Sequence, residues 1–304
     1  MTLSLPKTVS LSANLICVAS MLVWAAGLPA ANLVIPHAPP IALSALRNDL
    51  AALFLLPIWL AYDGFAALRR ANWLLGIGVG FGCVGLPAIF LVIAQARTDA
   101  VTVAIVTATM PIMGISLECL LDRRALTKAM VIGIALSLLG GLVALGRSGW
   151  GVNLGIGALA ALASTAFYTW GSRATVASFP DLSPIGRAAI TVTGAGLATS
   201  VLAVVVSGFG APGPDWAAFG WPEIGALLVF SVGSLGISQV LWIIAVGRLG
   251  IGLSSLHMNA VPFYVMLIMF ALGGAWNGLQ AIGAVVVGVG VLVAQGVIRL
   301  GRSR

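Results

Sequence analysis

The sequence predicts an all-α integral membrane protein with ten transmembrane helices, arranged as two inverted five-helix repeats with both termini cytoplasmic. Three observations support this fold class: an apolar composition, apolar runs of membrane-spanning length, and an internal repeat. Hydrophobic residues make up 60% of the 304 residues and charged residues 8%, and the mean hydropathy is +1.11. In soluble domains about a quarter of the residues are charged, so the composition excludes an ordinary soluble protein.

The apolar residues fall into ten runs of about 20 residues each. A helix of that length rises about 30 Å, which is the thickness of the hydrocarbon core of a bilayer. The connections between the runs are too short for a soluble domain, the longest lying at about 208–220. The predicted spans are residues 10–30, 41–61, 72–94, 99–121, 127–146, 154–178, 183–207, 221–245, 251–272 and 278–298.

An internal repeat relates the two halves of the chain. In both halves an Ala and an Arg precede a Pro by 17 and 14 residues, and three glycines follow that Pro at offsets that agree within one residue. Such self-similarity indicates a duplicated structural unit, so we divide the chain into a first five-helix unit, 1–150, and a second, 151–304. The matched positions are Ala94, Arg97, Pro111, Gly133, Gly140 and Gly146, and Ala245, Arg248, Pro262, Gly283, Gly290 and Gly296.

The basic residues predict the orientation of the chain. If the N-terminus is cytoplasmic and the ten spans alternate, twelve of the 15 Lys and Arg residues lie on the cytoplasmic side. Membrane proteins concentrate basic residues on that side, so the net charge of +7 reflects orientation and not nucleic-acid binding. The twelve are Lys7, Arg69, Arg70, Arg123, Arg124, Lys128, Arg173, Arg187, Arg248, Arg299, Arg302 and Arg304; the other three are Arg47, Arg97 and Arg147.

Five spans per unit is an odd number, so the second unit must enter the membrane in the opposite direction. Arg97 is then expected outside, whereas its counterpart Arg248 is expected inside. Inverted repeats of this kind are the architecture of secondary transporters, which hold their substrate near the midplane between the two halves.

This skeleton resembles the EamA-type units of the drug/metabolite transporter superfamily. The closest match runs from Pro111 through Asp122-Arg123 to Gly133 and Gly140. Asp122 stands where the family usually has Glu, which is a mild departure. The second unit lacks these charges, because its corresponding turn reads Gly273-Gly274-Ala275.

Two further segments extend the resemblance to nearly the whole chain. Trp24-Ala25-Ala26-Gly27 in the first run resembles the family's Trp-Gly turn, and Ala166-Phe167-Tyr168 resembles its second-unit version. The resemblance implies ten helices, cytoplasmic termini and export of small metabolites, with amino-acid exporters a prominent branch. We accordingly expect a multi-pass protein of the bacterial inner (plasma) membrane.

Stripes of polar, small or aromatic residues at three- to four-residue spacing mark the helix faces that would line a pathway. Two alternatives stay open: small and hydroxyl residues also support close helix packing, and Trp and Tyr near span ends also anchor helices at the interface. Pro111 and Pro262 are candidate hinges, since each removes a helical hydrogen bond. The candidate substrate-binding residues are Trp24, Phe81, Tyr168, Trp170, Gln239, Trp242, His257, Asn259 and Tyr264.

His257 and Asn259 are the expected partners of a polar head group. The first unit has Val106 and Ala108 at the matching positions, so packing alone does not require an imidazole and an amide there. A histidine that serves only packing is the alternative for His257.

Few ionisable side chains lie within the predicted spans, and such residues are functional candidates. They include Arg47 and Asp49 in the second span and Glu118 near the inner end of the fourth. For Glu118 the alternative is an ion pair with Arg123 or Arg124, which would account for a carboxylate at that position. No carboxylate lies at the middle of a span. Proton-coupled exchangers and exporters of cations normally use a buried acid, so a zwitterionic or weakly polar solute is favoured, moved by facilitation or exchange.

The expected function is export of small metabolites, most simply aromatic or hydrophobic amino acids, by alternating access through a central cavity. Aromatic and hydrogen-bonding groups together suit a bulky apolar solute with a polar head. The alternative within transport is a broad-specificity exporter of drugs or amphiphilic metabolites. An intramembrane enzyme is disfavoured, because clustered acid–base or nucleophilic groups are missing.

The expected partners are a small-molecule substrate and the lipid bilayer, with no nucleic acid, and the protein is expected to be a monomer. Cys17, Cys83 and Cys119 are widely spaced within predicted spans. That spacing matches no metal site or disulfide framework, so neither a metal nor a cofactor is expected.

Overall fold

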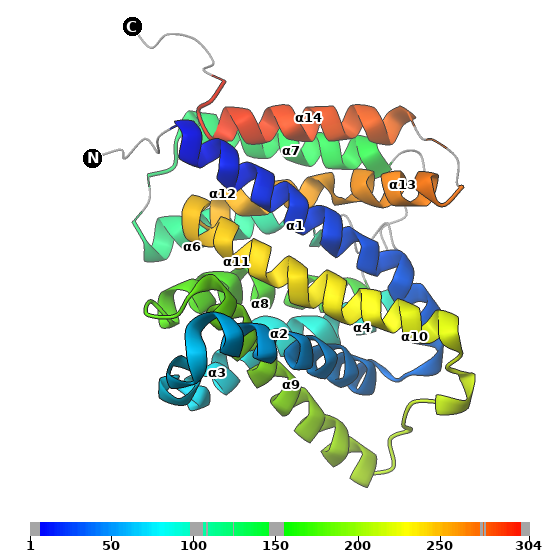
Figure 1. Ribbon diagram of the computed structural model, residues 1–304. Coiled ribbons are helices and arrows are strands. Elements are labelled where there is room, and N and C mark those ends of the chain that lie inside the picture. The colour runs from blue at the N-terminus through cyan, green and yellow to red at the C-terminus, as the bar shows by residue number, and fades with distance from the viewer. Residues whose placement is uncertain are drawn as a thin grey trace, which may run out of the picture.

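A computed structural model of the protein describes residues 7–97, 106–107, 109–123, 125–145, 155–273, 276 and 278–298. The regular elements in these ranges are all helical, as the sequence predicts (Figure 1). The first unit contains α1 (Lys7–Val34), η1 (Ile35–His37), α2 (Pro40–Arg70), α3 (Trp73–Gly80), η2 (Phe81–Gly85), α4 (Leu86–Arg97), α6 (Met110–Leu121) and α7 (Lys128–Leu145). The second contains α8 (Ile156–Ser178), α9 (Pro184–Gly208), η3 (Trp216–Ala218), α10 (Trp221–Leu228), η4 (Val229–Ile237), α11 (Ser238–Leu249), α12 (Ile251–Ser255), η5 (Leu256–Ala260), α13 (Val261–Ala271) and α14 (Gly278–Ala294).

Helices occupy the described part of each predicted span, but they differ in length. In the described residues, five helical stretches are long and apolar enough to cross a membrane, and α6, α7 and α14 include shorter apolar helices. The chain is therefore a multi-pass helical membrane protein, while the full set of ten spans stays a prediction. The five stretches are Leu11–His37, Pro40–Arg70, Trp73–Arg97, Pro184–Gly208 and Trp221–Leu249.

Two of these stretches contain a π-helical segment at matching places. The segments are η2 and η4. Adding the 151-residue offset between Pro111 and Pro262 to Phe81–Gly85 gives 232–236, which lies inside η4. Such segments loosen the helical hydrogen-bond pattern and are frequent at functional sites. Apolar periodicity predicts continuous helices here, and the structure adds a change of helical type at matching sequence positions of the two units.

Pro111 and Pro262 begin helices within their predicted spans. Each lies in the first turn, Pro111 in α6 and Pro262 in α13. A residue without an N–H is tolerated there, because the first backbone donors of a helix have no partner within it. In the second unit, α13 follows directly on the 3₁₀ segment η5, so the helix changes its winding immediately before the proline.

α7 and α14 lie side by side along one edge of the molecule (Figure 1). A Cβ atom built on Gly133 would lie 2.6 Å from the carbonyl oxygen of Gly290, and one on Gly140 would lie 2.6 Å from that of Gly283. Residue 133 thus meets residue 290 and residue 140 meets residue 283, which means that the two helices run antiparallel. The four glycines allow the backbones to touch, as small residues do between membrane helices.

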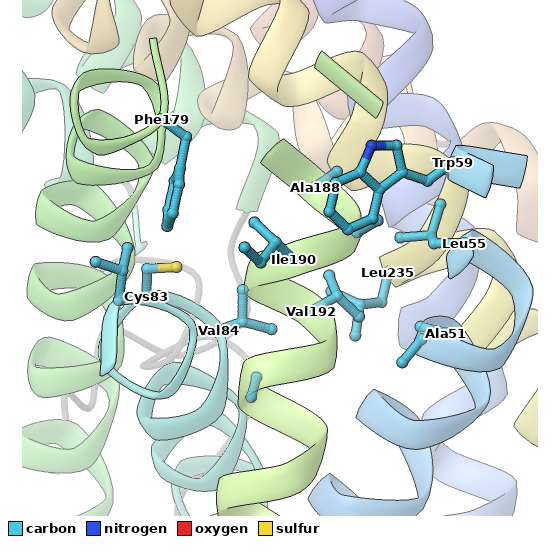
Figure 2. Close-up of a cluster of buried hydrophobic side chains, with 14 residues drawn as sticks. Ala51, Leu55, Trp59, Cys83, Val84, Phe179, Ala188, Ile190, Val192 and Leu235 are labelled. Atoms are coloured by element: carbon cyan, nitrogen blue, oxygen red, sulfur yellow. The ribbon is translucent and has the colours of Figure 1, made fainter. Parts of the chain in front are cut away.

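α2 and α9 also run antiparallel. Ser200 Oγ donates to Asp49 Oδ2 at 2.5 Å towards one end of the pair, and Ser183 Oγ donates to Asp63 Oδ2 at 2.5 Å towards the other. Between these contacts the two helices share a hydrophobic cluster with η2, in which Trp59 is fully buried. Figure 2 shows the side chains of this cluster gathered around α9. The polar contacts at each end fix the register of the pair.

A serine near the middle of α1 and one in α8 make the same contact with the other unit. Ser20 Oγ donates to the carbonyl oxygen of Ser238 at 2.9 Å, and Ser164 Oγ donates to the carbonyl oxygen of Pro87 at 2.8 Å. Pro87 and Ser238 are 151 residues apart, as Pro111 and Pro262 are. The helix that opens each unit is therefore tied to matching backbone positions of the opposite unit.

The charged turn after α6 is tied to α8. Arg173 Nε donates to Asp122 Oδ2 at 2.9 Å, and Arg173 Nη2 bonds to Asp122 Oδ1. The hydrogen bond from the Arg173 guanidinium holds the pKa of the Asp122 carboxyl below its usual value. One turn earlier, Glu118 is buried, and its Oε1 accepts a hydrogen bond of 2.9 Å from Gly252 N at the start of α12. Both acids thus hold α6 against helices of the second unit.

Candidate functional site

A cavity of about 60 Å³ lies where the two sequence units meet. Each unit supplies seven of its lining residues, which come from α1, α2, α4, α6, α8, η4, α11 and η5 and from the segment before α6. The lining consists of Trp24, Arg47, Pro87, Ala88, Leu91, Thr107, Met110, Ser164, Thr165, Tyr168, Ser234, Leu235, Gln239 and Met258.

The lining includes positions that the sequence repeat pairs. Ala88 and Gln239 are 151 residues apart, and so are Thr107 and Met258. Matched positions of the two units therefore line one cavity, but their chemistry differs, since the methyl group of Ala88 corresponds to the amide of Gln239 and the hydroxyl of Thr107 to the thioether of Met258.

Three of the predicted site residues line the cavity: Trp24, Tyr168 and Gln239. The Tyr168 hydroxyl donates to Gln239 Oε1 at 3.2 Å. Trp242 does not line the cavity but supports Tyr168, since their rings stack with 5.9 Å between centroids. Trp242 is fully buried, and its Nε1–H donates to Ser172 Oγ at 2.8 Å. The aromatic wall is thus held in place by hydrogen bonds behind it.

His257, Asn259 and Tyr264 lie near the cavity but outside its lining. His257 and Asn259 are buried on η5, where the residue between them, Met258, reaches the cavity. His257 Nδ1 lies 3.2 Å from the carbonyl oxygen of Ser254. The side-chain Nδ2 and Oδ1 of Asn259 have no hydrogen-bond partner among the described residues. Tyr264 is half-buried on α13.

Phe81 and Trp170 lie outside the cavity lining as well. Phe81 begins η2 and packs against Gly85, whose Cβ, if present, would lie 2.9 Å from the Phe81 ring. Trp170 on α8 is 42% exposed and packs against Gly82. Both rings are therefore placed beside the π-helical segment η2, where the glycines leave room for them.

Arg47 lines the cavity, although the sequence pattern does not single it out among the substrate-binding candidates. It lies on α2 and is 5% exposed. Its Nε donates to the carbonyl oxygen of Phe230 at 3.1 Å, and its guanidinium carbon lies 4.2 Å from the centroid of the Phe230 ring. The sequence signal that points to it is an ionisable side chain inside a membrane span.

The polar groups of the lining are hydroxyls, one amide, one guanidinium and the indole N–H of Trp24, and no carboxylate is among the lining residues that the structure describes. Nor do those residues contain a group of three or more His, Cys, Asp or Glu side chains able to hold a metal ion. The arrangement can bind a small solute by stacking, apolar contact and hydrogen bonding.

The chain is similar to known proteins in sequence and in fold. Residues 11–146 match the EamA-like transporter family. The uncharacterized transporter YyaM of Bacillus subtilis (strain 168) is 26% identical over 280 residues, which cover 89% of each chain. One solved crystal structure has a TM-score of 0.75 and 24% identity, with 93% of this chain and 96% of that chain covered. The last likeness shows the fold alone.

These similarities point to a membrane transporter and not to an enzyme. The chain is therefore a multi-pass membrane protein whose residues 11–146 are similar to the EamA-like transporter family.

Proposed function

We propose that the protein exports a small metabolite, most simply an aromatic or other hydrophobic amino acid, across the bacterial inner membrane by alternating access. The cavity carries this proposal, because it receives seven residues from each unit and combines aromatic faces, apolar side chains and hydrogen-bonding groups. Such a lining suits a solute with a bulky apolar part and a polar head.

The proposed architecture has ten spans in two inverted units, 1–150 and 151–304, with both termini cytoplasmic. The antiparallel pairs α7–α14 and α2–α9 support it, because equivalent helices of inverted units must point in opposite directions. A repeated close contact supports it further: Gly27 lies against the side chain of Ser234, and Gly171 lies against Cys83. Cys83 and Ser234 are again 151 residues apart.

Transport requires the cavity to change size. Its volume of about 60 Å³ is well below the roughly 300–1,000 Å³ of ordinary small-molecule sites. The elements suited to bend are the π-helical segments η2 and η4 and the helix starts at Pro111 and Pro262, where the regular hydrogen-bond pattern changes. Movement at equivalent places in inverted units would open the cavity alternately to the two sides.

In this proposal the apolar part of the solute lies against Trp24 and Tyr168. His257 and Asn259 reach its polar head when η5 moves. A buried amide without a partner costs about 1–3 kcal/mol, so a conformation in which a solute or water binds Asn259 removes that cost. The aromatic side chains of Phe81, Trp170, Trp242 and Tyr264 then shape the surroundings of the solute.

Uptake by the purified full-length protein in liposomes tests the proposal. The labelled solutes are a panel of L-amino acids, supplied with and without a pH gradient. We expect saturable uptake of hydrophobic amino acids above that of empty vesicles, without acceleration by the gradient. Uptake equal to that of empty vesicles for every amino acid would reject the amino-acid assignment.

A broad-specificity exporter of amphiphilic metabolites or drugs is the second candidate. Met110 and Met258 favour it, because both line the cavity and flexible thioether side chains adapt to ligands of different shape. The same liposomes distinguish the two candidates. Transport of neutral and cationic amphiphiles as fast as that of the amino acids would support the broad-specificity exporter.

A further inference from the structure

Arg47 is the charged side chain among the described residues of the cavity lining. A guanidinium has five N–H donors. Among the described residues, its Nε donates to the Phe230 carbonyl oxygen and its guanidinium lies over the Phe230 ring. The four N–H groups on the terminal nitrogens therefore have no acceptor among the described residues, although the side chain is only 5% exposed.

No described carboxylate neutralises this charge. Asp49 is close in sequence, but residues two positions apart point about 200° away from each other around a helix. Asp49 accordingly faces α9, where its Oδ2 accepts from Ser200 Oγ and its Oδ1 lies against Gly196. Buried charges are normally paired, and in a membrane protein an unpaired one marks a substrate or ion pathway.

The neighbouring polar groups divide into donors and acceptors. Gln239 adds a donor, since its Nε2 is buried without an acceptor among the described residues. The hydroxyls of Ser164, Thr165 and Ser234 donate their protons to backbone carbonyl oxygens. These hydroxyls therefore present only oxygen lone pairs to a solute, and lone pairs accept hydrogen bonds from an ammonium group.

We propose that Arg47 binds the carboxylate of the transported solute, and that the cavity therefore selects metabolites with a free carboxylate beside a bulky apolar group. The inference rests on the proposed transport function and names its substrate class. A guanidinium matches a carboxylate with two parallel hydrogen bonds. An amine that lacks a carboxylate meets an uncompensated positive charge instead, whereas an amino acid gains the hydroxyl oxygens for its ammonium group.

Ligand-dependent thermal stabilisation of the detergent-purified, full-length protein tests the inference without requiring transport, because a ligand that binds the folded state raises the unfolding midpoint. The probes share one ring and differ in charge: L-phenylalanine, 3-phenylpropionate, which lacks the ammonium, and phenethylamine, which lacks the carboxylate. We expect the two carboxylates to raise the midpoint of the wild-type protein and phenethylamine to leave it unchanged.

Arg47→Gln removes the charge, and Arg47→Lys keeps it without the planar pair of donors. Arg187→Gln is the matched control, because Arg187 also donates from Nε to a backbone carbonyl oxygen, that of Phe179, but lies outside the cavity lining. We expect the carboxylate concentration needed for a given stabilisation to rise at least tenfold in Arg47→Gln, to rise less in Arg47→Lys, and to stay unchanged in Arg187→Gln.

Equal stabilisation of the wild-type protein by phenethylamine and L-phenylalanine would overturn the inference, and this comparison does not depend on the folding of a variant. Unchanged carboxylate binding in Arg47→Gln, or no stabilisation by either carboxylate, would overturn it as well. Carboxylates that bind through Arg47 but do not cross liposomes would reject the proposed function alone. Equal transport rates for solutes that have a carboxylate and solutes that lack one would reject this inference but not the proposed function.

Discussion

Gly133 on α7 and Gly290 on α14 face each other with no room for a side chain on either. A Cβ atom at position 133 would lie 2.6 Å from the Gly290 carbonyl oxygen, and one at position 290 would lie 2.8 Å from the Gly133 carbonyl oxygen. The glycines that reveal the sequence repeat thus form the contact between α7 and α14, the last helices of the two units. Membrane helices often associate through such close backbone contacts, because burying apolar surface provides no hydrophobic driving force in lipid.

Gly133→Ala is expected to destabilise the protein by about 1–3 kcal/mol, the cost of overpacking a close contact. Thermal unfolding in detergent measures it. Gly288→Ala on α14 is the matched control, because a Cβ there meets nothing within 4 Å and Ala is the better helix former. If both variants unfold at the wild-type temperature, the backbone contact between α7 and α14 does not exist.

The inverted topology predicts the sides of two reporter fusions. A reporter after Arg304 is expected in the cytoplasm, and one inserted at Gly213, in the exposed connection between α9 and α10, is expected outside. Reporter activity in intact cells measures both. A cytoplasmic signal from the Gly213 fusion would contradict the ten-span arrangement and, with it, the inversion of the two units.

The Asp122–Arg173 pair predicts a pH dependence of stability. The bond from Arg173 lowers the pKa of Asp122 in the folded state, so the stabilisation is fully present above the unfolded value of about 3.9 and is lost as the pH falls through the lowered folded value. The pair is partly exposed, so it contributes at most about 1 kcal/mol.

Asp122→Asn is the variant that isolates this pair. Its unfolding midpoint is expected to lie below that of the wild-type protein at pH 7, and the difference is expected to shrink as the pH falls below about 4. The measurement is the midpoint as a function of pH in an uncharged detergent. A difference that stays constant down to the lowest pH would show that the carboxylate charge of Asp122 is not responsible.

His257→Ala and Asn259→Ala are expected to raise the half-saturating solute concentration about tenfold, since a lost hydrogen bond to a charged group costs about 1.5–3 kcal/mol. Concentration-dependent uptake into liposomes measures it. Arg248→Gln, at an exposed position of α11, serves as a control. Unchanged uptake constants in well-folded variants would assign both side chains to packing.

The sequence predicted the helical class well, because long apolar runs have few alternatives in a membrane. It did not predict the π-helical segments η2 and η4 or the 3₁₀ segment η5, since an apolar run does not specify which carbonyl each N–H bonds. The glycine spacing did not predict the contact between α7 and α14 either. Gly133 and Gly140 form this interface, but the residues that they contact are known only from the positions of the helices in the structure.

The cavity lining was predicted in part, and the difference between Arg47 and Asn259 shows why. Both are polar residues inside predicted spans, yet Arg47 lines the cavity and Asn259 does not. Lipid is as apolar as a protein core, so an apolar helix lacks the amphipathic pattern that would show which face points inward. The position of a residue within its span predicts its depth in the membrane, but it does not predict which way the side chain points around the helix axis.

Solute uptake through a deliberately narrowed cavity tests the central claim most directly. Ala88 lines the cavity and is 3% exposed, so Ala88→Leu fills space on the proposed path, whereas Ala61→Leu enlarges an exposed position of α2. We predict saturable uptake of labelled L-phenylalanine into liposomes by the wild-type protein and by Ala61→Leu, and uptake at least tenfold slower by folded Ala88→Leu. Equal uptake by all three proteins would contradict transport through this cavity.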